Sequence, residues 1–245
     1  MLMDTTAVKN YVVWHNCEIT EDRPQFGIGS ASEPGVRGDY NRMHEISLAS
    51  ARHFLKGDWE PIVFTDPERT RVEMFKNSWH RICDLWMTQD CNILYLDSDT
   101  VFVRPTEIFG VMPGFRLFNW TTPKTQHGFE NYFNAGVRYY PSTMSMDLWR
   151  QGSDLAWNWN LDIWDQEQQI FNKMFWTQDL DWHDAHRPQL NWQAPTGDFN
   201  NIAQHSGFND CDYQYAQIIH YHGTRSSDRG QRLAEQLARS AGVPL

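Results

Sequence analysis

The chain has 245 residues, 40% of them hydrophobic, which is enough for one domain with a sizeable core. Its formal net charge of −10 and its lack of a basic run exclude general binding to nucleic acid or to an anionic membrane. The four cysteines are widely spaced, which argues against a zinc site or a disulfide scaffold and favours a reducing compartment.

The first predicted elements follow a short amino-terminal segment. Residues 1–4 lack the pattern of a signal peptide, and no apolar run approaches the roughly 20 residues that span a bilayer. We therefore expect a cytoplasmic protein without a membrane span. Residues 10–15 predict a strand, and the loop at 16–38 is long enough to be functional. Asp39 is expected to cap a helix with apolar residues at helical spacing, which ends at Gly57.

A second strand and two helices are expected next. Residues 61–64 are typical of a short buried strand. Asp66 and Pro67 should begin one helix that ends near Phe75, and Ser78 should cap another. Strands and helices that alternate in this way predict a parallel sheet with right-handed crossovers.

The third strand runs directly into two aspartates. The apolar run at residues 92–96 is followed by Asp97, Ser98 and Asp99. In an extended backbone, residues i and i+2 point to the same side, so the two carboxylates would converge at the carboxyl edge of the sheet. Hard oxygen ligands of this kind suit Mg²⁺ or Mn²⁺ bound to a diphosphate. The alternative is an ordinary turn, because Asp and Ser are common turn residues.

The carboxyl-terminal half mixes short strands, helices and loops. The predicted strands lie at 115–120, 132–140 and 217–221, and the predicted helices at about 143–159, 165–175 and 228–241. Residues 179–212 are rich in loop-forming residues. The last helix is amphipathic and is expected to close the domain.

Four short motifs follow one another along the chain: Leu96-Asp97-Ser98-Asp99, Asn134-Ala135-Gly136-Val137, Asp165-Gln166 and His220-Tyr221-His222-Gly223. Their order and spacing resemble the GT-A glycosyltransferases, most closely the retaining branch that contains glycogenin and bacterial lipopolysaccharide galactosyltransferases. The resemblance covers about residues 11–225. It implies a GT-A (Rossmann-like) α/β fold, with a mixed, mainly parallel sheet flanked by helices in a single compact domain over residues 1–245.

The same resemblance implies an activity and its partners. About residues 1–110 would bind the nucleotide, about 111–225 the sugar and acceptor, and 226–245 would form a closing helix. The expected enzyme is a hexosyltransferase that moves a sugar from a nucleotide-diphosphate sugar to the hydroxyl of a carbohydrate or other acceptor. The expected donor is a UDP-sugar, and a GDP-sugar is the alternative.

A metal site for Mn²⁺ or Mg²⁺ is part of this expectation. By resemblance its ligands are Asp97, Asp99 and His220, of which Asp99 binds the ion more firmly and Asp97 also serves the ribose. Without the family match, a single histidine on an apolar strand is more often a hydrogen-bonded core residue. His222, two residues further, is the competing ligand.

Further positions match donor-binding residues of the family. Tyr40 would stack on the uracil ring and Arg81 would contact the donor, as would Ser98 in the aspartate motif. Core packing and a solvated helix surface are the alternatives for Tyr40 and Arg81. After Gly223 the chain departs from the family's Lys-Pro-Trp, and Arg225 is the candidate cation for the β-phosphate.

Three residues are candidates for catalysis. By resemblance Asp165 would hold sugar hydroxyls, Gln166 would lie beside the anomeric carbon, and Asn134 would lie close to the sugar. A neutral glutamine is a poor nucleophile, so the resemblance favours retention of configuration by front-face attack. Asp165 could instead be a helix cap and Asn134 a turn residue.

Two other functions fit parts of the sequence. Residues 94–101 also match the signature of phosphohydrolases in which Asp97 would form an aspartyl phosphate and Asp99 would act as acid and base. That signature normally lies on the first strand, whereas here two strands precede it. The 12 tryptophans would also suit a carbohydrate-binding protein without turnover.

Overall fold

A computed structural model describes residues 8–16, 40–67, 71–112, 114–118, 133–157, 166–178, 187–193, 213–221 and 227–245. Its main sheet has five strands in the order β2-β1-β3-β6-β5. The strands are β1 (Lys9–His15), β2 (Glu60–Phe64), β3 (Cys91–Leu96), β5 (Arg116–Leu117) and β6 (Val137–Tyr140). The first three are parallel, and β6 and β5 add an antiparallel edge. The predicted mixed α/β sheet is confirmed.

A second, smaller sheet was not predicted from the sequence. It contains β4 (Thr100–Phe102), β7 (Trp192–Gln193) and β8 (Ile218–His220), in the order β4-β8-β7. The strands β4 and β8 are antiparallel, and β7 is parallel to β8. Because β4 follows β3 after a turn of three residues, this sheet begins at the carboxyl edge of the main one.

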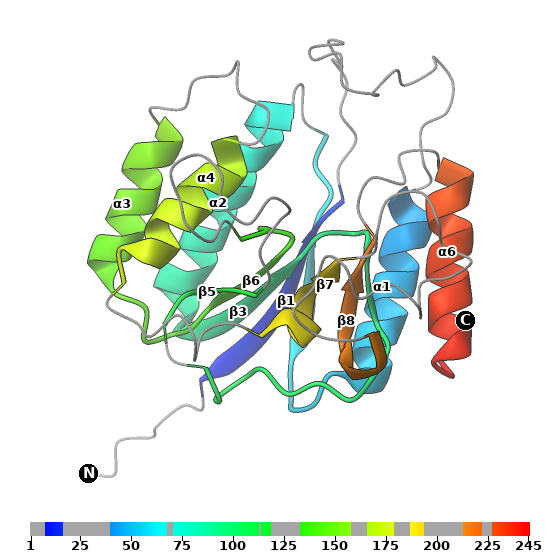
Figure 1. Cartoon of the computed structure of the whole chain (residues 1–245). Helices are drawn as coiled ribbons and strands as arrows, with labels where there is room; N and C mark the ends of the chain where they lie inside the picture. The colour runs from blue at the N-terminus through cyan, green and yellow to red at the C-terminus, as the bar shows by residue number, and fades with distance from the viewer. Residues whose placement is uncertain are drawn as a thin grey trace.

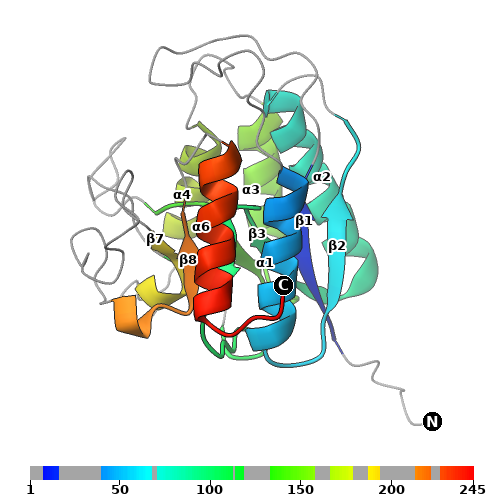
Figure 2. The same cartoon turned by 90° about the vertical axis from the view of Figure 1, so that its right-hand side faces the viewer.

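Helices cover the sheets in two groups. The described helices are α1 (Tyr40–Phe54), α2 (Arg71–Gln89), α3 (Met146–Trp157), α4 (Gln166–Trp176) and α6 (Ser227–Ser240), with short 3₁₀ turns η1 (Pro188–Asn191) and η3 (Tyr213–Tyr215). In Figure 1 α2, α3 and α4 lie on one side of the main sheet, and α1 and α6 lie beyond the small sheet. Figure 2 shows α1 and α6 side by side. Among the described residues, no helix is both long and apolar enough to cross a membrane.

The helix α2 corrects one prediction. Two helices were expected over this region, with Ser78 as the cap of the second, but residues 71–89 form one continuous helix. Ser78 is buried inside it, with 3% of its surface exposed. The segment contains no glycine or proline, so nothing interrupts the backbone hydrogen bonds. Asp90, which has a φ of 45°, ends the helix.

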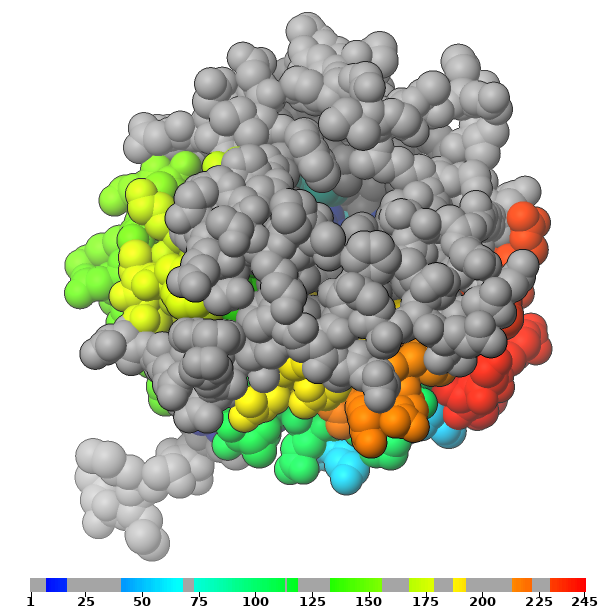
Figure 3. Space-filling model, viewed as in Figure 1, coloured from blue at the N-terminus to red at the C-terminus, as the bar shows by residue number. Residues whose placement is uncertain are grey.

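Alternate side chains of β3 enter two different cores. Ile93 and Tyr95 pack with residues of α2, α3 and α4. Leu94 and Leu96 point the other way and pack with residues of α1, β4 and β8. This period of two is the geometry of an extended strand, and each fully buried aliphatic side chain contributes about 1.5–3 kcal/mol. The space-filling view in Figure 3 shows α3 and α4 at one flank of the molecule and α6 at the other.

A candidate metal centre at the carboxyl edge of the sheet

The two aspartates converge through a turn. The strand β3 ends at Leu96, Ser98 and Asp99 form a turn, and β4 starts at Thr100. The hydroxyl of Thr100 closes this turn by donating a hydrogen bond to the backbone oxygen of Asp97, at 2.8 Å. The prediction of an extended backbone through both aspartates is therefore wrong, and the alternative prediction of a turn is confirmed. The turn nevertheless brings both carboxylates to one place.

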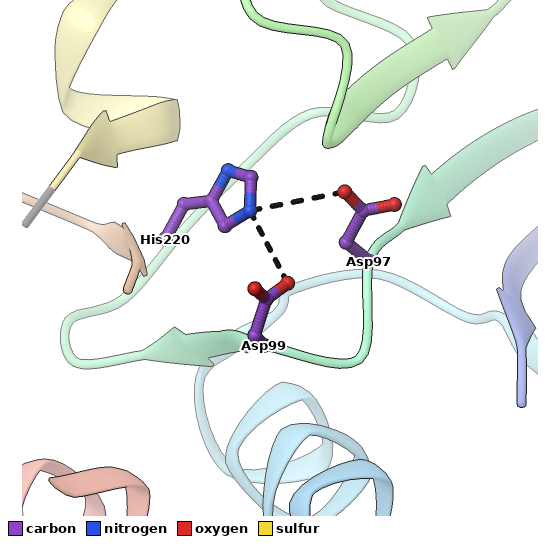
Figure 4. A group of neighbouring side chains, drawn as sticks. All are labelled: Asp97, Asp99 and His220. Carbon is purple, nitrogen blue, oxygen red and sulfur yellow. Dashed lines mark ion pairs between the residues drawn. The ribbon is translucent and has the colours of Figure 1, made fainter. Parts of the chain in front are cut away.

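The small sheet adds a histidine to this pair. His220 lies opposite Thr100 in the pairing of β8 with β4, and it is 2% exposed. Its Nε2 atom is 3.2 Å from Oδ1 of Asp99 and 3.8 Å from Oδ2 of Asp97 (Figure 4). One ligand atom from each of the three residues lies within 4.8 Å of the others. The structure thus brings together the three residues predicted as metal ligands.

The geometry and charge of this group fit a small divalent cation. Neighbouring ligands of an octahedral Mg²⁺ lie about 3 Å apart when each is about 2.1 Å from the ion. The distance of 3.2 Å from His220 to Asp99 is close to this spacing, and the distance of 3.8 Å to Asp97 is longer. The carboxylate oxygens of Asp97 and Asp99 also suit Mn²⁺. Burial disfavours the charged imidazole, but the carboxylates of Asp99 and Asp97 outweigh burial and raise the pKa of His220. The site therefore attracts positive charge.

Gly136 allows the backbone to approach this group closely. Its carbonyl oxygen accepts a hydrogen bond from the backbone N–H of Asp97, at 2.8 Å. A Cβ atom at Gly136 would lie 2.2 Å from Cε1 of His220 and 2.7 Å from Oδ2 of Asp97. No side chain fits at those distances, so glycine is required by the close packing of the Asn134–Val137 motif on His220 and Asp97.

Asn134 points its side-chain oxygen at the histidine. Oδ1 of Asn134 accepts a hydrogen bond from the backbone N–H of Gly136 at 2.8 Å and one from Nδ2 of Asn191 at 3.2 Å. The same oxygen lies 3.1 Å from Nδ1 of His220. Asn134 was predicted to lie near the sugar, and that role stays a prediction. Asn191 was not identified from the sequence, because it occurs in a segment predicted as loop.

Two side chains of α4 hold the backbone that carries Asn134. The side-chain amide of Asn172 accepts from the backbone N–H of Phe133 at 2.7 Å and donates to its carbonyl oxygen at 2.8 Å. Oε1 of Gln168 accepts from the backbone N–H of Ala135 at 3.1 Å. Neither residue was identified from the sequence. Their spacing of four residues, which places two amides on one helix face, was the available signal.

His15 is the last residue of β1, and Arg81, on α2, reaches the carboxyl end of β2 with its side chain. Arg81 pairs with Asp66 at 2.9 Å, and its guanidinium lies 5.3 Å from the centre of the Phe64 ring. His15 is 8% exposed and immediately follows Trp14, the register partner of Leu96. Burial, followed by the charges of Arg81 and Arg138, lowers the pKa of His15 to about 4. His15 is thus a neutral buried histidine that was predicted only as part of a strand.

Several predicted site residues lie outside the described part of the chain. Asp165, Gly223 and Arg225 are among them, as is His222, the competing metal ligand. Tyr40 is the first residue of α1 and Gln166 is the first residue of α4, but the structure describes only the backbone of these two residues. Their roles in binding and catalysis stay predictions.

No protein-family model and no curated protein matches the chain. Solved structures do match it. The glycosyltransferase GlyE of Streptococcus pneumoniae TIGR4 aligns over 96% of this chain and 64% of its own, with a TM-score of 0.50 and 16% identity. The bifunctional glycosyltransferase WbbM aligns over 96% of this chain and 52% of its own, with a TM-score of 0.51 and 9% identity.

A third similar structure is a glycosyltransferase involved in the glycosylation of the major capsid of PBCV-1. It aligns over 93% of this chain and 99% of its own, with a TM-score of 0.51 and 12% identity. The chain spans less than two thirds of GlyE and about half of WbbM. At these identities the likeness is one of fold. The predicted glycosyltransferase fold is confirmed.

Proposed function

We propose that the chain is a metal-dependent glycosyltransferase that moves a hexose from a nucleotide-diphosphate sugar, by default a UDP-sugar, to an acceptor hydroxyl. The observation that carries this proposal is the meeting of Asp97, Asp99 and His220 at the carboxyl edge of the parallel strands. Open α/β sheets bind ligands at that edge. The three similar structures that share the fold are glycosyltransferases.

The chemistry of the reaction explains why such a group is needed. Transfer breaks the bond between the anomeric carbon and the diphosphate, which leaves with added negative charge. A Mn²⁺ or Mg²⁺ ion held by the three ligands would neutralise that charge as a Lewis acid. Without a cation, Asp97 and Asp99 would repel the diphosphate. The donor is therefore expected to bind only together with the cation.

The stereochemistry we propose is retention. The acceptor oxygen would bond to the anomeric carbon on the face from which the diphosphate leaves, and the acceptor proton would pass to the leaving phosphate oxygen. Asp165 would hold sugar hydroxyls, and Gln166 would lie beside the anomeric carbon. This part of the proposal rests on the resemblance of the Asp-Gln motif, since the described side chains do not include either residue.

A thermal-shift panel tests nucleotide and metal binding together. UDP should raise the melting temperature when Mn²⁺ is present and have little effect with a chelator. Asp99→Asn should abolish the metal-dependent shift. The matched control is Asp147→Asn, because Asp147 is a highly exposed aspartate on α3, and this variant should respond like the unchanged chain. A larger shift with GDP than with UDP would change the donor assignment.

A turnover assay separates the proposed enzyme from its rivals. Release of UDP from UDP-hexoses, dependent on Mn²⁺ and on Asp99, supports the glycosyltransferase. Hydrolysis of a simple phosphomonoester without nucleotide binding would support the phosphohydrolase instead. Binding of sugars without turnover of any nucleotide-sugar would support a non-catalytic carbohydrate-binding protein.

A further inference from the structure

We propose that Asn134 is a positioning residue of the metal centre. Its side-chain oxygen fixes the proton of His220 on Nδ1, so that Nε2 presents its lone pair to the metal ion. This inference deepens the proposed function and rests on its metal site. It assigns Asn134 a task on the far side of the histidine from the ion, distinct from the predicted contact with the sugar.

The contacts of Asn134 identify which of its amide atoms faces His220. The backbone N–H of Gly136 can only donate a hydrogen bond, and it lies 2.8 Å from the side-chain atom in question. An NH₂ group of Asn191 also points at this atom, at 3.2 Å. An atom that meets two donors must be the oxygen, because an amide nitrogen would repel both. The atom that faces the histidine is therefore an acceptor.

That assignment determines the tautomer that the histidine adopts as a metal ligand. Nδ1 of His220 lies 3.1 Å from the Asn134 oxygen, so Nδ1 must carry a proton and donate it. A neutral imidazole has one protonated nitrogen, so Nε2 then keeps its lone pair. Nε2 is the atom that faces Asp99 and Asp97 (Figure 4). The opposite tautomer would place two acceptors against each other and remove the ligand atom from the site.

The scaffold holds Asn134 firmly enough for this task. Asn134 is 8% exposed, and both neighbouring residues are fixed by α4. Asn172, which is fully buried, binds both backbone groups of Phe133, and Gln168 binds the N–H of Ala135. An outer hydrogen bond of this kind orients a ligating histidine and raises its basicity. Because α4 begins at Gln166, the predicted sugar-binding helix also supports the metal ligand.

Mn²⁺ affinity of the full chain, measured by titration calorimetry, tests the proposal. Asn134→Ala should weaken Mn²⁺ binding by about 10- to 100-fold, as expected for loss of an outer-shell partner. Asn134→Asp keeps an acceptor at the same place and should bind Mn²⁺ at least as well as the unchanged chain. The matched control is Asn92→Ala, because Asn92 also uses its side chain to bond to Asn10 and Ser142, at the opposite end of β3. That variant should lose stability while it keeps its Mn²⁺ affinity.

The tautomer is measured separately by nitrogen NMR of the metal-free protein, at a pH where His220 is neutral, with the His220 signal identified by its loss in His220→Asn. The unchanged chain and Asn134→Asp should hold more of the proton on Nδ1 than Asn134→Ala does, because only they keep an acceptor facing Nδ1. Mn²⁺ affinity of Asn134→Ala within twofold of the unchanged chain would overturn the proposal, as would an equal loss in Asn134→Asp. Absence of Mn²⁺ binding by the unchanged chain would instead remove the proposed function, and this inference with it.

Discussion

Thr100 and His220 face each other as register partners in the antiparallel pair of β4 and β8. Thr100 is the first strand residue after the turn that carries Asp97 and Asp99, so this register decides where the histidine meets the carboxylates. Side chains alternate along a strand, so a shift of one residue in the pairing of β8 with β4 would turn His220 to the other face of the small sheet, away from the carboxylates. The metal centre therefore depends on pairing between two segments that are far apart in the sequence.

Gly136→Ala should impair metal binding through a steric clash. The added methyl group would lie much closer than van der Waals contact to His220 and Asp97 and would force these two ligands apart. We expect at least a tenfold loss of Mn²⁺ affinity, measured by titration calorimetry. Gly152→Ala is the matched control, since its methyl group would collide with Trp79 and Met174 inside the helical layer. That variant should lose about 1–3 kcal/mol of folding stability and keep its affinity, and equal affinity in both variants would refute the argument.

Mn²⁺ binding should weaken as the pH falls. In the metal-free protein the carboxylates of Asp99 and Asp97 raise the pKa of His220 above 6.5 despite its burial. Below the raised pKa the ion must displace a proton from the ring, so affinity should drop about tenfold for each pH unit. Titration calorimetry in buffers with different ionisation enthalpies measures the released proton directly. Affinity that does not change between neutral pH and pH 5 would show that His220 is not a ligand.

The choice between the two histidines at the end of β8 can be made by substitution. His220→Ala should lower Mn²⁺ affinity strongly, because it removes the nitrogen that lies 3.2 Å from Asp99. His222→Ala serves as the comparison at a residue outside the described part of the chain. A loss confined to the His222 variant would transfer the ligand role to His222.

Acid should destabilise the protein through His15. Burial, with the charges of Arg81 and Arg138, lowers its pKa from 6.5 to about 4. As the pH falls below 6.5, His15 is protonated in the unfolded chain but stays neutral in the folded one. The free energy of unfolding is therefore unaffected by His15 above pH 6.5 and falls by on the order of 3 kcal/mol as the pH drops to about 4. His15→Phe should flatten this part of the stability profile in urea titrations. The exposed residue His80 on α2 provides the control His80→Gln, and an unchanged slope for His15→Phe would contradict the assignment.

Asp165→Ala should separate catalysis from nucleotide binding. Its proposed contacts are to the sugar, so turnover should fall much more than the affinity for UDP. Proton NMR of the first product formed from an α-linked donor reports the stereochemistry. An α-linked product agrees with retention, whereas a β-linked product would overturn retention and leave the metal site untouched.

The sequence by itself determined the features that depend on local patterns. The apolar run of β3, the strands β1 and β2, and the amphipathic helix α6 were predicted near their observed bounds, because side-chain periodicity reports which face of an element is buried. The order of the short motifs predicted the glycosyltransferase fold. The same order of motifs also selected the three residues of the metal centre, although it does not give the distances between their side chains.

Only the tertiary structure decided how those residues meet. Local pattern could not show that Ser78 lies inside one helix, since a serine that caps a helix and one buried by packing look alike in sequence. The small sheet depends on long-range pairing of β4 with β8, which sequence periodicity does not encode. The same pairing places His220 against Asn134, whose side-chain oxygen also accepts a hydrogen bond from Asn191. Contacts between distant segments are fixed by the packing of the whole domain, and that is why the surroundings of the metal centre were visible only in three dimensions.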